Sequence, residues 1–145
     1  MANVLYNNAR ELFLTGSLDW STDPVRAVLV GITPGDVNKY VFSAAHTALS
    51  NVTAAARVST LGANFTTPTT TGGVAGADNI TFATVTLPAG VTSVGAVVLY
   101  AYDAGTPENS LLIAYIDSAT GLPVVPNGGD IIVQWDVGAN KIFRL

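Results

Sequence analysis

Apolar positions follow a helical spacing only near the start of the chain. The apolar residues of one predicted helix face recur at i, i+4, i+7 and i+8, and they are Leu5, Ala9, Leu12 and Phe13. Asn3 is suited to cap the N-terminus of this helix, and Gly16 is suited to end it in the left-handed conformation. The pattern therefore predicts one α-helix, at about residues 4–14.

Over the rest of the chain, β-branched and aromatic residues gather in short segments bounded by Gly, Pro, Asn or Asp. The segments that predict strands are residues 25–32, 79–87, 94–102, 111–116, 130–136 and 141–145. A shorter candidate strand is residues 40–43, and the Ala-rich residues 44–56 are compatible with a helical turn or with a loop. Residues 65–76 are rich in Thr and Gly and carry no charge, so they are expected to form a surface loop or a hairpin arm.

The strand predicted at residues 79–87 changes its phase part of the way along. Ile80 and Phe82 share one face, whereas Val85 and Leu87 lie on the other phase of the alternation. A bulge near Ala83 would return all of these side chains to one core.

Two segments, residues 94–102 and 111–116, are apolar on both faces. A strand with one face in solvent alternates apolar and polar residues. These two segments do not alternate, so they are expected at the centre of a sandwich or under a neighbouring subunit. We predict an all-β single domain over residues 1–145, an antiparallel β-sandwich of jelly-roll-like type with one short N-terminal α-helix. Residues 1–20 form its N-terminal helix or arm.

Composition narrows the classes of function. The chain has no Cys, which excludes thiol nucleophiles and cysteine-ligated metals, and its net charge of −4 argues against a nucleic-acid partner. No run of apolar residues is long enough to span a bilayer, and no signal peptide is evident, so a soluble cytosolic product is expected. Only 11% of the residues are charged, and a hydroxyl-rich and amide-rich surface favours packing against other subunits.

Candidate catalytic and metal-binding residues are not accompanied by the partner residues that their chemistry requires. His46 is the single His, Asp36 is the nearest upstream acid, and no nucleophile signature accompanies them. Carboxylates for glycoside hydrolysis are available at strand ends, where Asp commonly caps turns: Asp103, Glu108, Asp117, Asp130 and Asp136. A calcium site from Asp78, Asp103 or Asp117 matches no known loop spacing. We therefore expect no enzyme, no metal and no cofactor.

Two blocks of the sequence resemble a family of known proteins. The first is LYNNARELFLTGSLDW followed by VRAVLV, and the second is SLLIAYIDSATGLPVVPNGGDIIVQWDVGANKIFRL. The chain resembles small virion structural proteins of tailed bacteriophages over most of its length, except at residues 37–76. The likeness is most specific in residues 114–145, at Asp117, Gly121-Leu122-Pro123, Pro126-Asn127-Gly128-Gly129-Asp130, Trp135 and Phe143.

This resemblance implies a head decoration (cement) protein that is made in the host cytoplasm and binds the major capsid protein on the phage head. It also implies a homo-oligomer, with a trimer favoured. Partner contacts are expected at Leu5, Phe13, Trp20, Tyr100, Tyr102 and Tyr115. For the N-terminal residues, a lid over one end of the sandwich is an equal alternative to a docking arm.

The alternative function is a carbohydrate-binding or receptor-binding module on a fibre, collar or tail. Its sugar platform would consist of Tyr100, Tyr102, Tyr115 and Trp135, although the same aromatic residues are also suited to fill the core. A hydrolase is a third and weaker alternative.

Overall fold

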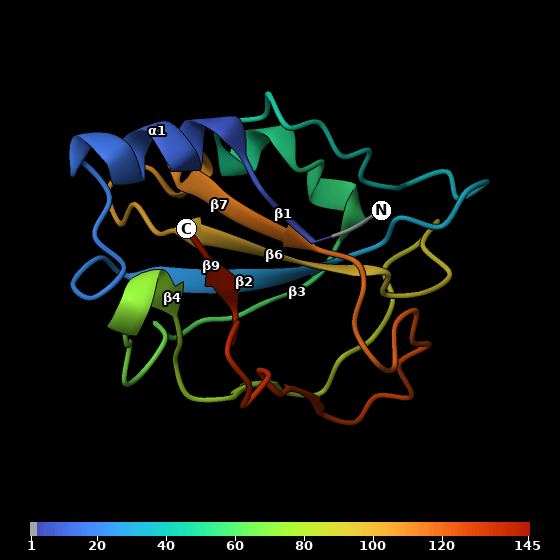
Figure 1. Ribbon diagram of the computed structural model, residues 1–145. Coiled ribbons are helices and arrows are strands. Elements are labelled where there is room, and N and C mark those ends of the chain that lie inside the picture. Colours follow the sequence, from blue (N-terminus) through green and yellow to red (C-terminus); the bar gives the residue numbers. More distant parts are fainter. Residues whose placement is uncertain (1–2) are drawn as a thin grey trace.

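The computed structural model describes residues 3–145, and its main element is an antiparallel sheet of five strands in the order β1-β7-β6-β2-β3 (Figure 1). These strands are β1 Val4–Leu5, β2 Val25–Val30, β3 Arg57–Thr60, β6 Ala96–Ala101 and β7 Leu111–Ile116. Two further pairs form short antiparallel ribbons: β4 Val74–Ala75 with β9 Phe143–Arg144, and β5 Ile80–Phe82 with β8 Ile131–Val133. Antiparallel sheets therefore carry the fold.

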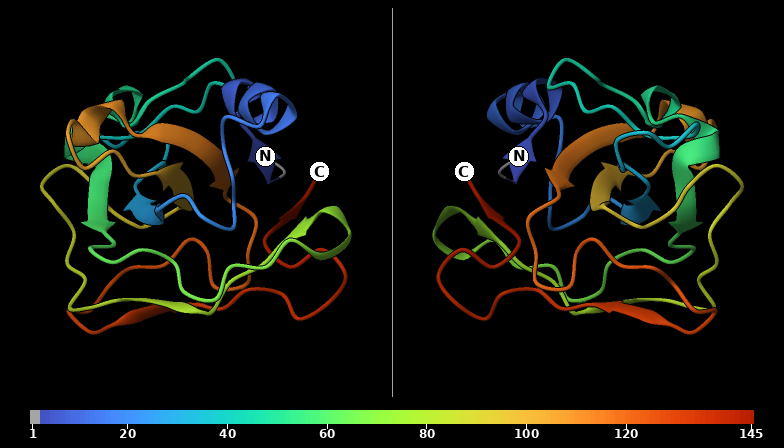
Figure 2. Two further views of the ribbon diagram at one scale, coloured as in Figure 1. Left: turned by 90° about the vertical axis from the view of Figure 1, so that its left-hand side faces the viewer. Right: turned by 90° about the vertical axis from the view of Figure 1, so that its right-hand side faces the viewer.

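One short α-helix, α1 Asn7–Thr15, lies on one side of the sheet, and the β5–β8 ribbon lies on the other (Figure 2). The connections add four single turns of 3-10 helix: Leu49–Asn51, Ala54–Ala56, Thr71–Gly73 and Pro107–Asn109. None of the helices within residues 3–145 has the length and apolarity needed to cross a bilayer. The fold is thus mainly β, with little helix.

The helix begins later than the sequence predicts. Residues 4–5 pair with β7 as strand β1, and Asn3 is no cap, because its side chain exchanges two hydrogen bonds with the backbone of Ser118. The N-cap is Tyr6, and the backbone N–H of Asn7 donates to the carbonyl of Ala44. A tertiary contact thus satisfies the helix start. The end is as predicted, since Gly16 adopts the left-handed conformation.

The two segments that are apolar on both faces, β6 and β7, are buried along almost their whole length, as predicted. Strand β6 lies between β2 and β7, so its backbone is paired on both edges. Because alternate residues point to opposite faces, both faces of the sheet are covered by other parts of the same chain. Burial of these strands requires no neighbouring subunit.

The phase change in residues 79–87 is real, but the strand stops there instead of continuing through a bulge. β5 ends at Phe82, and Thr84 has a positive φ of 47°. Backbone pairing resumes at Val85. Its N–H donates to the carbonyl of Gly129, and its carbonyl accepts from the N–H of Gly128. Ile80, Phe82 and Val85 are consequently all buried in one core.

The prediction of a strand at residues 40–43 is wrong. Tyr40 is buried and its N–H donates to the carbonyl of Gly31, but the segment makes no strand pairing. Residues 44–56 contain two of the 3-10 turns, and strand β3, which follows them, was not predicted. The burial of Tyr40 accounts for the apolar pattern that suggested a strand.

The Thr-rich and Gly-rich residues 65–76 form a hairpin arm. Thr69 and Gly76 exchange two backbone hydrogen bonds of 2.8 and 2.9 Å, and β4 follows the turn at Thr71–Gly73. The C-terminal strand β9 pairs with β4, so the arm is held by residues about seventy positions later in the chain. β8 and β9 are shorter than the strands predicted at residues 130–136 and 141–145.

Candidate functional site

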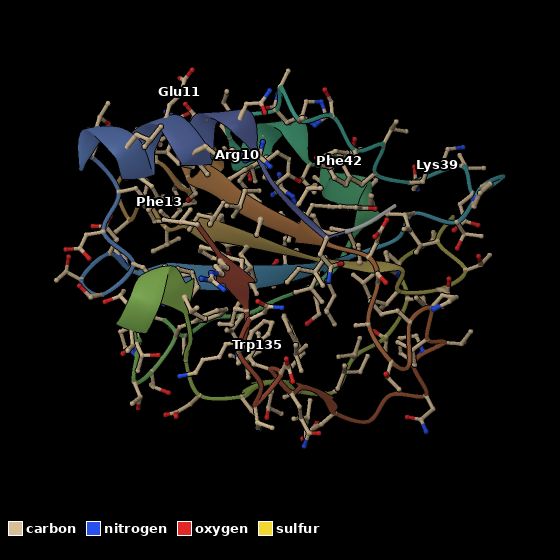
Figure 3. The ribbon with its side chains drawn as sticks, in the orientation of Figure 1. Arg10, Glu11, Phe13, Lys39, Phe42 and Trp135 are labelled. Carbon is tan, nitrogen blue, oxygen red and sulfur yellow. The ribbon has the colours of Figure 1, made fainter. Side chains whose placement is uncertain are left out.

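The six residues predicted to contact a partner lie in different surroundings. Leu5, Trp20, Tyr100 and Tyr115 are buried, whereas Phe13 and Tyr102 are half-buried. Figure 3 shows Phe13 on the side of α1 that faces the sheet, and Glu11 on its outer side. Most of these side chains therefore pack within their own chain and support the fold.

Tyr115 belongs to an aromatic cluster on one face of the sheet. Its ring centroid lies 4.6 Å from that of Phe42 and 6.1 Å from that of Tyr40. The Tyr40 hydroxyl lies 2.9 Å from the Tyr6 hydroxyl and 2.9 Å from His46 Nδ1, so the three polar groups form one hydrogen-bonded chain. Burial raises the pKa of Tyr6, Tyr40 and Tyr115 above that of a free tyrosine.

Five further aromatic residues touch in succession, and Trp20 is in the middle. Phe13 contacts Phe143, which contacts Trp20; Trp20 contacts Phe65, and Phe65 contacts Trp135, with centroid distances from 5.1 to 6.0 Å. This aromatic row joins the helix, the hairpin arm and the C-terminal strand. It is a structural element, and no local sequence pattern predicts it.

The residues of the predicted sugar platform do not share an exposed face. Tyr100 and Tyr115 are only 1% and 2% exposed. The guanidinium of Arg26 lies 3.5 Å above the ring centroid of Tyr102, and Trp135 packs against Phe65 in the aromatic row. A sugar needs an open ring face for stacking, so these four residues do not provide the platform.

His46 and Asp36 are separately engaged and do not form a catalytic pair. His46 Nδ1 is hydrogen-bonded to the Tyr40 hydroxyl. The Asp36 carboxylate accepts hydrogen bonds of 2.9 Å from both the backbone N–H and the hydroxyl of Thr92. Because each side chain is bonded to a different partner, Asp36 does not orient His46 as a base that would activate a nucleophile.

The acidic candidates mainly organise turns and ends of strands. Three accept hydrogen bonds from backbone N–H groups: Asp103 from Gly105 and Thr106, Asp130 from Thr84, and Asp136 from Gly138. Glu108 is paired with Arg57. Asp117 follows β7, and its charge adds to the effect of burial in raising the pKa of Tyr115.

The candidate calcium ligands are likewise dispersed. The Asp78 carboxylate accepts hydrogen bonds from the hydroxyls of Thr66 and Thr67 at 3.0 and 2.7 Å. Across residues 3–145, no group of three or more His, Asp or Glu side chains is close enough to hold a metal ion.

Arg57 offers a test of how much one ion pair stabilises the fold. Its side chain donates to the carbonyls of Leu49 and Val52 and to both oxygens of Glu108. Arg57→Ala is expected to lower the free energy of unfolding by about 2–3 kcal/mol, because two carbonyls lose charged donors. Glu108→Gln should cost less than about 1 kcal/mol, because Glu108 is exposed.

Denaturant unfolding of both variants measures this difference, and equal losses would contradict it. The hydrogen bonds from Arg57 also hold the pKa of Glu108 below its ordinary value. The small contribution of the pair is therefore present above the ordinary pKa and is lost as the pH falls through the lowered value.

A groove of about 760 Å³ runs between α1, the edge strand β1 and the C-terminal strand β9. Its lining combines residues from the start of the chain, from β7 and from residues 136–145. Among the predicted contact residues, Leu5, Phe13 and Tyr115 line this groove. The groove itself was not predicted, because it exists only where segments more than a hundred residues apart come together.

No protein-family model matches the chain, and no curated protein is significantly similar to it.

Proposed function

We propose that this protein is a structural component of a tailed-phage virion, namely a head decoration (cement) protein that binds the major capsid protein as a homo-oligomer, with a trimer favoured. The proposal follows from the family resemblance of residues 114–145 and from the surface of the molecule. It assigns no reaction to the chain. In support of a non-enzymatic role, the candidate acids are used in turns and His46 is bonded to Tyr40.

The observation that carries the proposal is the character of the surface. Only 11% of the residues are charged, and several large apolar side chains stand exposed. They are Leu14, Val37, Val41, Val125, Ile132, Val137 and Leu145. A surface of this kind can lose water against neighbours on several sides with few ions to desolvate, as membership of a lattice requires.

The stabilising mechanism would be additive. Burial of one exposed Val or Leu side chain contributes about 1.5–3 kcal/mol, which is weak for a single contact. Linked subunits convert later contacts into intramolecular ones, so an oligomer on a symmetric shell gains avidity without new kinds of contact. The summed contacts would oppose the outward pressure of packaged DNA.

We also propose the finer description of the fold. The five-stranded sheet and the β4–β9 and β5–β8 ribbons would form the two layers of a small β-sandwich. Support comes from the core, in which Ile80, Phe82 and Val85 of the ribbon side are buried together with β6 and β7. The jelly-roll-like order of strands stays a prediction.

An electron-microscopy structure of the intact particle tests the proposal directly. We expect density for this chain to repeat over the capsid lattice, with high copy number, and we expect particles without the protein to lose DNA more readily on heating. Density confined to the neck, a fibre or the tail would contradict the decoration role. It would instead favour a receptor-binding or attachment role.

A further inference from the structure

We propose that the groove between α1, β1 and β9 binds an extended, acidic segment of another protein, which adds as a strand to the free edges of β1 and β9. This inference concerns peptide recognition and does not depend on where the protein lies in a particle. It rests on three observations: two strand edges with unpaired backbone groups, an apolar lining, and a concentration of positive charge.

The first strand edge belongs to β1, the outermost strand of the five-stranded sheet. Leu5 is opposite Ala114, and the next residue, Tyr6, donates its N–H to the carbonyl of Ile113 at 3.0 Å. Residues of an antiparallel strand alternate between facing the partner and facing away. The N–H and C=O of Leu5 therefore face away from β7.

The second edge belongs to β9, which pairs with β4 on one side. Leu145 donates its N–H to the carbonyl of Gly73 at 3.0 Å, and Arg144 is opposite Val74. By the same alternation, the N–H and C=O of Arg144 face away from β4. Leu5 and Arg144 both line the groove, so within residues 3–145 each presents a free backbone donor and acceptor at the same depression.

The side chains specify what kind of strand fits. The apolar part of the lining includes Val4, Leu5, Phe13, Ile116, Ile142 and Phe143. Alternate side chains of an added strand would point onto this apolar floor, as in other cases of strand addition. The occupant therefore carries apolar residues at every second position.

Charge specifies the other positions. The chain has six Lys and Arg residues, and Arg10, Lys141 and Arg144 line this one groove, whereas Asp136 is its lining acid. Asp136 uses one carboxylate oxygen to accept from Gly138. The chain as a whole has a net charge of −4, so this positive region stands out against its own surface. An acidic segment is complementary to it.

The probe is a synthetic peptide of about eight residues in which valine and aspartate alternate. Added to the isotopically labelled full chain, it should shift the backbone amide resonances of residues 3–5 and 143–145. The double variant Arg10→Glu, Arg144→Glu should weaken binding at least about tenfold. Both side chains are exposed, so the fold should persist.

Lys39→Glu is the matched control, because Lys39 stands on a projecting loop away from the groove and should leave the affinity unchanged (Figure 3). A second probe tests strand addition itself: methylation of alternate backbone nitrogens of the peptide should abolish binding, because it removes the donors of one edge.

Several outcomes would overturn the proposal. They are no binding of the valine–aspartate peptide, equal binding of a valine–lysine peptide, or equal binding after methylation. A protein that dimerises through this groove would assign it to a second copy of the chain and would also overturn the proposal.

Discussion

Replacing Trp20 by alanine is expected to lower the free energy of unfolding by about 4 kcal/mol. Trp20 is 4% exposed, and its ring makes edge-on contacts with Phe65 and Phe143 at centroid distances of 6.0 and 5.1 Å. Its indole N–H donates to the carbonyl of Gly76 at 2.9 Å. The substitution would remove the middle of the aromatic row, leave a cavity and leave that carbonyl without its donor.

Two further variants separate these contributions. Trp20→Phe keeps a ring but removes the donor, and it should cost about 1–2 kcal/mol from the lost hydrogen bond, in addition to the smaller ring. Val37→Ala should change stability by less than about 0.5 kcal/mol, because Val37 is 89% exposed. Urea unfolding gives all three values. A loss below about 1 kcal/mol in Trp20→Ala would contradict the assignment of Trp20 to the core.

The second large effect is a loss of stability in alkaline solution. Burial is the main cause of a raised pKa in Tyr6, Tyr40, Tyr100 and Tyr115, each of which has an ordinary value of 10.0. A raised native pKa means that the stabilisation is fully present below pH 10 and is lost as the pH rises through the native values. The unfolded chain ionises first and is thereby favoured.

The size of this effect follows from the difference in bound protons between the folded and the unfolded chain. Each tyrosine that ionises only in the unfolded chain costs about 1.4 kcal/mol per pH unit, so Tyr6 and Tyr115 together cost about 3 kcal/mol at about pH 11. Urea unfolding from about pH 8 to about pH 11 measures the slope. Tyr115→Phe should reduce the slope of the unfolding free energy against pH by the contribution of one tyrosine, about 1.4 kcal/mol per pH unit. A flat profile would contradict the prediction.

These two effects also bear on the proposed groove. Phe143 lines the groove and contacts Trp20, and Tyr115 also lines the groove. Loss of Trp20 should therefore loosen β9 and weaken the binding of the valine–aspartate peptide, even in molecules that remain folded. Particle binding through Val37, Val41, Val125 and Ile132 would be affected less, because these exposed residues do not line the groove.

Several parts of the fold follow from local chemistry alone, and the sequence predicts them correctly. Strands β6 and β7 carry apolar residues on both faces, which is compatible only with a covered position. Gly16 ends the helix because a residue without a Cβ adopts the left-handed conformation at low cost.

Other parts depend on contacts between distant segments, and local patterns mislead there. Leu5 has the spacing of a helix residue but forms strand β1 with β7, because this pairing adds backbone hydrogen bonds and buries the Leu5 side chain. Tyr40 looks like a strand residue, but its phenol is held by Tyr6 and His46. Sequence alone could not foresee these choices, since the competing partners are many residues away.

The candidate site divides in the same way. From the sequence came the absence of cysteine chemistry, the low charge and the strand-end position of the acids, because these depend only on residue type and order. Only the tertiary structure decided that Trp20, Tyr100 and Tyr115 are core residues and that Arg10, Lys141 and Arg144 surround one groove. Burial and the gathering of charges are properties of packing, and packing joins residues that the chain keeps far apart.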